Sequence, residues 1–321
     1  MKTYPLESMS IEDAKKFQFA LVDAVTRHFK GSEILSLGDL GVVKGLNKPR
    51  TTLKVEETLA DFFGTEKAVL VRGAGTGALR FGIMSMLKAG DTLLVHDAPI
   101  YPTTKVNIDA MGINIIKTDF NKKDSIIRAL KENEINAVLV QYTRQKIDDK
   151  YDMKEVIDII KSFNSDLPVI TDDNYAVMKV RNIGAQCGAD LSAFSMFKLL
   201  GPEGVGCVLG KREYVDKIIE FNYSGGSQVQ GHEAMEALKG LIYAPVQLAI
   251  QGEVNKELVT RLNNGEVRCI KSAFLANAQS KVVLVEFEED IAKKVLEEAE
   301  RLGVAPNPIG AESKYEFVPM I

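Results

Sequence analysis

Short apolar segments alternate with amphipathic segments between about residues 55 and 210. The apolar segments are rich in β-branched residues and lack the polar alternation of a strand with one face in water. They therefore predict a mostly parallel sheet that helices cover on both faces. The expected strands are 68–71, 92–95, 113–116, 137–140, 169–171, 191–194 and 206–209. Helical spacing of apolar residues predicts helices over 77–87, 125–132, 153–163 and 213–221.

The end of the chain repeats this alternation on a smaller scale. Residues 281–288 predict a strand and 290–302 a helix, which Gly303 and Pro306 should end. The sequence shows no internal repeat, and no long polar linker separates independent modules, so the parts should pack tightly. The expected organisation is an N-terminal segment over 1–50, a large domain over 51–245 and a small, incomplete C-terminal domain over 246–321.

Composition narrows the kind of protein and ligand. The 321 residues are 45% hydrophobic with a net charge of -4, which is typical of a soluble globular protein. No membrane span and no signal peptide is evident, so a cytoplasmic protein that does not bind membranes is expected. Lysine and arginine are scattered, which argues against nucleic acid, and the three separated cysteines predict neither disulfides nor a metal site. The ligand is expected to be a small molecule.

A lysine follows one expected strand and precedes a glycine-rich turn. Lys198 is flanked by Phe197 and Leu199, where desolvation would favour the neutral amine that forms an imine with an aldehyde. Ser195, three residues earlier, could reach a phosphate on the same ligand. Taken alone, the pattern also fits a lysine whose stem packs beside a turn while its charge reaches water.

Two adjacent carboxylates end another apolar strand. Asp172 directly follows the strand, where open α/β sheets bind ligands, and Tyr175 lies three residues later. A carboxylate in this position could pair with a protonated pyridine nitrogen. Asp173 should point away and bond locally, and a solvated pair of turn acids remains the alternative for both.

A glycine turn joins an expected strand to a helix at residues 73–78. Backbone N–H groups there, with the Thr76 hydroxyl, could bind a phosphate at the helix N-terminus. The same residues satisfy the G-x-G-x-x-A pattern of dinucleotide sites, and Asp97 follows the next strand at the ~20-residue spacing those sites need. A nicotinamide dehydrogenase is therefore an alternative.

One small phosphorylated aldehyde, pyridoxal 5'-phosphate (PLP), would use all three segments at once. A nicotinamide cofactor would leave Lys198 and Asp172 without a role, so PLP is the favoured cofactor. Tyr101, in a loop bounded by prolines, could stack on the pyridine ring, although simple packing explains such a tyrosine equally well.

These residues, in this order, resemble the fold-type I PLP enzymes, which include aspartate aminotransferase, the class V aminotransferases and the Cys/Met-metabolism lyases. The matching positions are Ala74, Gly75 and Thr76 of the phosphate turn, the stacking aromatic Tyr101, the pyridine partner Asp172, the phosphate serine Ser195 and the imine lysine Lys198. The resemblance covers the whole large domain. It implies the α/β fold of the PLP-dependent transferases, with a mostly parallel seven-stranded sheet and a smaller α/β C-terminal domain.

Closer similarity is to a bacterial group of uncharacterised proteins classed as aminotransferases. It is carried by the runs GDLG, GLNKPR, RGAGTGALR, HDAPIYPTT, TDDNYAVMKV, FKLLGPEGVG, YSGGSQVQG, ANAQSK and GAESKYE. The resemblance further implies a homodimer with shared active sites, in which Arg50 contacts the partner's phosphate. It also makes Gln141 and Tyr175 ring contacts and Arg144 a carboxylate contact.

The expected activity is transfer of an amino group from an amino acid to a 2-oxo acid, with Lys198 as the base that removes the α-proton. A β- or γ-elimination lyase of the Cys/Met type is the alternative. The resemblance also implies a later arginine for the substrate carboxylate, which is missing before Ile321. A third possibility is therefore a PLP-fold protein that binds without turnover.

Overall fold

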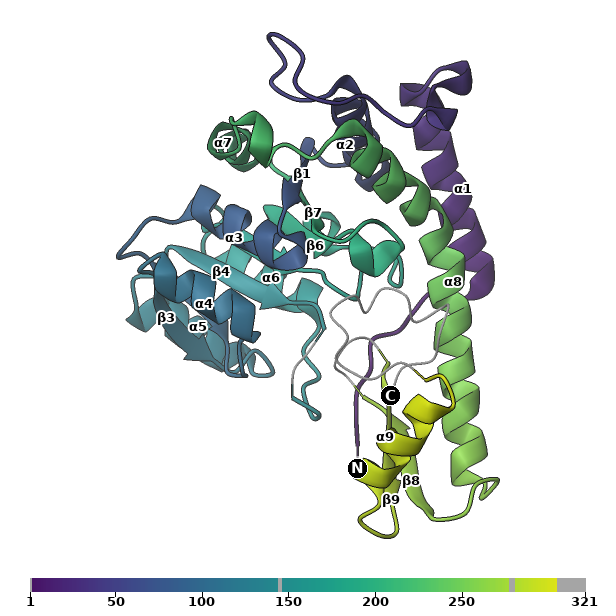
Figure 1. Ribbon diagram of the computed structural model, residues 1–321. Coiled ribbons are helices and arrows are strands. Elements are labelled where there is room, and N and C mark those ends of the chain that lie inside the picture. Colours follow the sequence, from purple (N-terminus) through teal and green to yellow (C-terminus); the bar gives the residue numbers. More distant parts are fainter. Residues whose placement is uncertain (1, 144–145, 277–280, 305–321) are drawn as a thin grey trace.

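A seven-stranded sheet forms the centre of the molecule (Figure 1). The structure is a computed structural model and describes residues 2–143, 146–276 and 281–304. The strands are β1 (Lys67–Arg72), β2 (Thr92–His96), β3 (Asn114–Thr118), β4 (Ala137–Gln141), β5 (Val169–Asp172), β6 (Leu191–Ser195) and β7 (Val205–Gly210). Their order is β1-β7-β6-β5-β4-β2-β3, and β7 alone in this sheet runs antiparallel to its neighbours. All seven expected strands and the mostly parallel sheet are confirmed.

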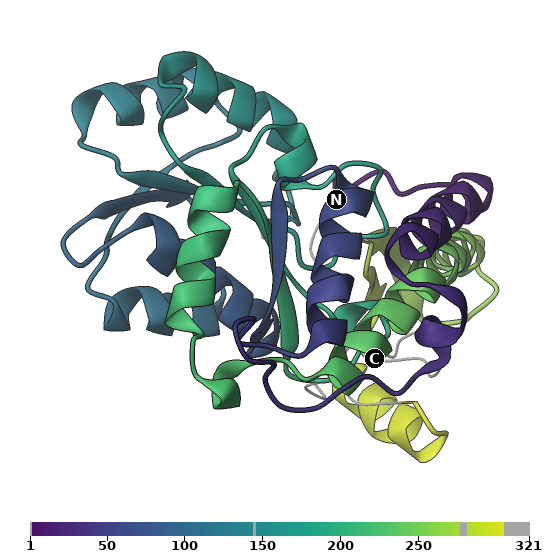
Figure 2. The ribbon, with the colours of Figure 1, turned by 90° about the horizontal axis from the view of Figure 1, so that it is seen from above.

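Helices cover both faces of the sheet, because successive strand residues point to opposite sides (Figure 2). In β1, Ala68 and Leu70 pack in the core formed with α1 (Ile11–His28), α2 (Arg50–Phe63) and α8 (Gly231–Asn263). Val69 and Val71 pack on the opposite face, against α3 (Ala74–Met86). The helices α4 (Pro102–Ala110) and α7 (Arg212–Phe221) share the face of α3, whereas α5 (Lys123–Glu132) and α6 (Met153–Phe163) cover the other face beyond β5.

A smaller unit follows the long helix α8, which runs from the large sheet to a two-stranded one (Figure 1). In this unit β8 (Ile270–Leu275) pairs antiparallel with β9 (Val283–Phe287), and α9 (Ala292–Arg301) follows. The expected strand and helix of the tail are confirmed as β9 and α9. The expected boundary between residues 245 and 246 falls inside α8. Among the helices that the structure describes, none has the length and apolar character to cross a bilayer.

Candidate cofactor site

The predicted site residues lie where the strands end at one edge of the sheet. Gln141 ends β4 and Asp172 ends β5, and the two are direct partners across these parallel strands. Ser195 ends β6, the next strand, and the glycine turn follows β1. Because β1, β4, β5 and β6 all point the same way, residues distant in sequence meet at this edge.

Asp172 is a buried acid with a positive charge nearby. Its Oδ1 atom accepts hydrogen bonds from the backbone nitrogen of Asn174 (3.1 Å) and from Asn174 Nδ2 (2.7 Å). Burial raises the pKa of the Asp172 carboxyl above its usual range, while hydrogen bonds from Asn174 and Gln141 and the charge of Lys198 oppose that rise. A buried carboxyl of this kind suits a cationic partner such as a protonated pyridine nitrogen.

Lys198 lies in a tight turn directly after β6. Its Nζ atom is 3.3 Å from the centroid of the Tyr175 ring and 5.8 Å from that of Phe197, so it makes a cation–π contact with Tyr175. Tyr175 and Leu200 have φ angles of 65° and 63°, which side chains other than glycine adopt rarely. Such strained backbone gathers at functional sites, where the surrounding structure enforces it.

The glycine turn presents only part of its backbone to a ligand. The N–H groups of Gly73 and Ala74 donate to the Gly204 carbonyl (2.8 and 3.1 Å). Gly75 and Thr76 follow in the first turn of α3, whose N–H groups lack acceptors within the helix. These two residues are therefore better placed than Ala74 to bind a phosphate through the backbone.

The Ser195 hydroxyl is the polar group that best fits a phosphate. Its side chain is buried, and its Oγ atom has no hydrogen-bond partner within residues 2–143, 146–276 and 281–304. A buried hydroxyl without a partner is costly, and a phosphate oxygen would satisfy it. With the turn at Gly75, the acid Asp172 and the amine of Lys198, this hydroxyl completes a site whose chemistry fits PLP.

Tyr101 lies beside the glycine turn, and Arg50 lies outside this cluster. Tyr101 immediately precedes α4 with half of its side chain exposed, and Thr103 in the same helix places its hydroxyl 2.8 Å from that of Thr76. Arg50 is the exposed first residue of α2. Arg144 lies outside the described residues.

Asp173 turns away from the site, as the sequence predicts. It is fully buried, and its Oδ2 atom accepts the Gly184 N–H at 3.0 Å. Burial raises its pKa to about 6, and the nearby charge of Asp172 adds to the rise.

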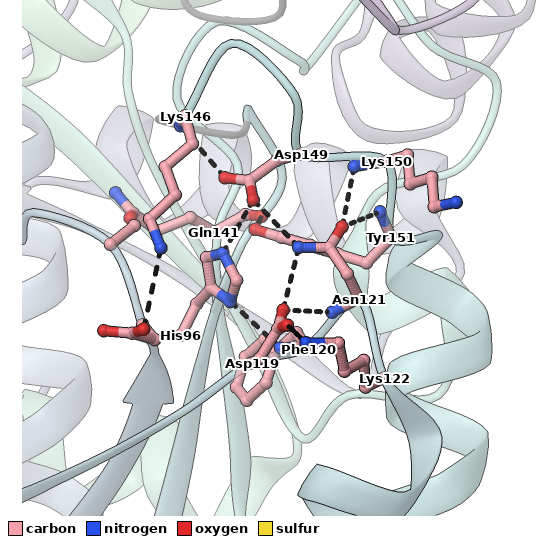
Figure 3. A network of polar contacts seen from close by, with 12 residues as sticks. His96, Asp119, Phe120, Asn121, Lys122, Gln141, Lys146, Asp149, Lys150 and Tyr151 are labelled. Atoms are coloured by element: carbon pink, nitrogen blue, oxygen red, sulfur yellow. Dashed lines mark hydrogen bonds and ion pairs between the residues drawn. The ribbon is translucent and has the colours of Figure 1, made fainter.

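A second polar network, missed by the sequence interpretation, holds the segment after β4 (Figure 3). His96 Nδ1 accepts the Phe120 N–H at 3.0 Å, so Nε2 carries the hydrogen and donates it to buried Asp149 at 2.9 Å. Tyr151, whose ring packs against that of His96, donates its hydroxyl to the Gln141 carbonyl at 2.7 Å. His96 therefore has a structural role, and the network stabilises the backbone of Gln141 through Tyr151.

Strand order excludes the nicotinamide interpretation of the glycine turn. A dinucleotide fingerprint requires its strand to lie in a parallel βαβ unit with the next strand of the chain. Here β1 is an edge strand antiparallel to β7, and four strands separate it from β2.

Comparisons with known proteins identify the family of this chain. A family model described as Cys/Met metabolism PLP-dependent enzyme matches residues 46–270, and a YhfS-like C-terminal domain matches residues 256–321. The uncharacterised protein YhfS of Escherichia coli strain K12 is 52% identical over 320 residues, which cover 100% of this chain and 88% of that protein.

Solved structures also resemble this chain in fold. The crystal structure of the pyridoxal-5'-phosphate dependent protein YhfS from Escherichia coli has a TM-score of 0.95 at 52% identity, covering 98% of this chain and 87% of the other. A carbon–sulfur lyase involved in aluminium resistance, from Clostridium novyi NT, shares the fold with a TM-score of 0.74 at 19% identity. It covers 94% of this chain, which corresponds to 77% of the lyase. This chain therefore belongs to the Cys/Met-metabolism family of PLP-dependent enzymes and is close to YhfS.

Proposed function

We propose that this chain is a PLP-dependent lyase that removes a β- or γ-substituent from a sulfur-containing amino acid. The match to the Cys/Met-metabolism family over residues 46–270 carries this proposal. Two structures of the same fold bear the names carbon–sulfur lyase and cystathionine γ-lyase, the latter from Micromonospora echinospora (TM-score 0.68, 17% identity, 88% of this chain and 82% of the other). The comparisons thus favour elimination over the amino transfer that the sequence first indicated.

Most of the predicted contacts would hold the cofactor. The Gly75 and Thr76 N–H groups and the Ser195 hydroxyl would bind the phosphate, and Asp172 would pair with the pyridine nitrogen. Tyr101 would cover the ring and exclude water from it. Gln141 already contacts Asp172 from the neighbouring strand and would fix its orientation toward the ring.

Bound PLP supplies an electron sink that stabilises negative charge on a substrate α-carbon. Lys198 Nζ would accept the proton from that carbon. Tyr175 would hold the resulting ammonium over its ring, because that contact is already present in the structure. Lys198 and Tyr175 together would keep the proton close for a later transfer.

We also propose a cytoplasmic homodimer. The loop before α2 exposes Leu37, Leu40 and Val42, with 83, 74 and 50% of their surfaces accessible, which is unusual for a segment held in place. Asp39 fixes this loop by accepting the backbone N–H groups of Arg50 and Thr51 at the start of α2. A second copy would cover the three apolar side chains, and Arg50 beside them could then reach the partner's phosphate.

Product analysis distinguishes the possible reactions. The PLP-loaded protein should release ammonia and a 2-oxo acid, together with a thiol from L-cystathionine or hydrogen sulfide from L-cysteine, and Lys198→Ala should release none of these products. Exchange of amino groups with a 2-oxo acid, without ammonia, would show an aminotransferase instead. Bound PLP without either reaction across a panel of amino acids would favour a binding protein.

A further inference from the structure

Asn174 connects the two ends of the cofactor site. Its Nδ2 atom donates to Asp172 Oδ1 at 2.7 Å, and its Oδ1 atom accepts the Ser195 N–H at 3.0 Å. The same amide lies against the phosphate turn, since a Cβ atom on Gly75 would fall 2.5 Å from Asn174 Oδ1. One side chain thus contacts the acid expected at the pyridine nitrogen, the serine expected at the phosphate, and the glycine of the phosphate turn.

We propose that Asn174 is a positioning residue that fixes the pyridine acid and the phosphate site relative to each other. Only an amide offers a donor at one end and an acceptor at the other in so short a side chain. An aspartate would place a second carboxylate against Asp172, and a leucine of similar shape would make neither hydrogen bond. The spacing between Asp172 and Ser195 therefore depends on this amide.

The amide also acts on the charge of Asp172. Asn174 donates two hydrogen bonds to the same oxygen, one from its backbone and one from its side chain. Both favour the ionised carboxylate that a protonated ring nitrogen requires, against the opposing effect of burial. Loss of the side-chain bond should therefore weaken PLP binding from both ends of the ring.

This inference rests on the PLP site and not on which reaction the protein performs. Its test is accordingly a binding experiment: the absorption titration of apo protein with PLP gives the dissociation constant for each variant, and thermal unfolding of the apo protein reports its integrity. A wild-type protein without lyase activity would contradict the proposed function and leave this experiment interpretable.

The variants are Asn174→Asp and Asn174→Leu, with Asn222→Leu as the matched control. Asn222 is a buried amide at the end of α7 that donates to the Ile218 carbonyl at 3.0 Å. Asn174→Leu should weaken PLP binding by about tenfold or more at every pH, the equivalent of one charge-assisted hydrogen bond. The control should lower apo stability but leave PLP affinity within about twofold of wild type.

Asn174→Asp gives a readout that a purely structural role would not produce. Two adjacent carboxylates raise each other's pKa, so at lower pH they share one proton and the pair again carries a single charge. The affinity deficit relative to wild type should therefore shrink as pH falls from about 8 to about 6. The proposal is overturned if Asn174→Leu loses no more PLP affinity than the control. It is equally overturned if the deficit of Asn174→Asp does not change with pH.

Discussion

Ser195→Ala should change stability and cofactor affinity in opposite directions. The Ser195 hydroxyl is buried without a partner in the described part of the chain, so the apo protein bears the cost of desolvating it. Removing an unsatisfied buried hydroxyl should stabilise the apo protein by about 1 kcal/mol. For a chain of this size, that corresponds to a rise in melting temperature of roughly 1 to 2 °C.

The same substitution removes a hydrogen bond to a charged phosphate oxygen. Such a bond contributes about 1.5 to 3 kcal/mol, so PLP affinity should fall by roughly 10- to 100-fold. The PLP-dependent increase in melting temperature, which follows from binding to the native state alone, should shrink accordingly. Without PLP, the variant should melt at a higher temperature than wild type. At PLP concentrations that saturate the wild-type protein, the variant should melt at a lower temperature than wild type.

Ser192→Ala provides the control, because Ser192 is a buried serine in the same strand that does have partners. Its Oγ atom accepts the Ala185 N–H at 2.8 Å and lies 3.2 Å from Thr171 Oγ1. This variant should lose about 1 kcal/mol of apo stability and keep its PLP affinity. The reasoning fails if apo Ser195→Ala melts at or below wild type, or if its dissociation constant for PLP is unchanged.

Three further predictions concern residues around the site. Because the folded pKa of Asp173 is raised to about 6, its folded form binds more protons than its unfolded form between about pH 4 and 6, and stability falls as pH rises through that range. Asp173→Asn should flatten this part of the pH profile of apo unfolding, and an unchanged slope would refute the assignment. Tyr175→Leu should slow proton removal by Lys198 several-fold, whereas Tyr175→Phe, which keeps an aromatic ring, should retain most of the rate. The rate is measured by the loss of α-deuterium from the substrate, and equal effects of the two substitutions would exclude a role for the cation–π contact. Asp149→Leu leaves His96 Nε2 unpaired in the core and should destabilise the protein by about 3 kcal/mol, measured by urea unfolding, whereas a change under about 1 kcal/mol would show that the network is dispensable.

The large sheet was predictable because each strand is a short β-branched run bounded by turns. The tail strand β9 and helix α9 carried equally plain periodicity. Other elements did not: α8 packs against α1, α2 and the sheet, so its apolar residues do not follow one stripe. The helix α4 begins directly after Tyr101, in a segment whose prolines indicated a loop, although proline is well tolerated in the first turn of a helix.

The site itself was partly predictable for a similar reason. Lys198, Asp172, Ser195 and the glycine turn all follow strands, and parallel strands bring their ends to one edge. The sequence did not reveal Asn174, because its partners stand two and 21 residues away and meet only after β5 and β6 pair. Nor could the sequence exclude a dinucleotide site, since strand order is a long-range property of the fold.

The covalent attachment of PLP to Lys198 tests the account most directly. We would record the absorption spectrum of the purified protein with PLP before and after borohydride, compare it with Lys198→Ala, and locate the modified peptide by mass spectrometry. The account predicts a yellow band that borohydride removes while fixing PLP to Lys198, and no such band in the variant. A band that persists unchanged in Lys198→Ala, or PLP fixed to another lysine, would contradict it.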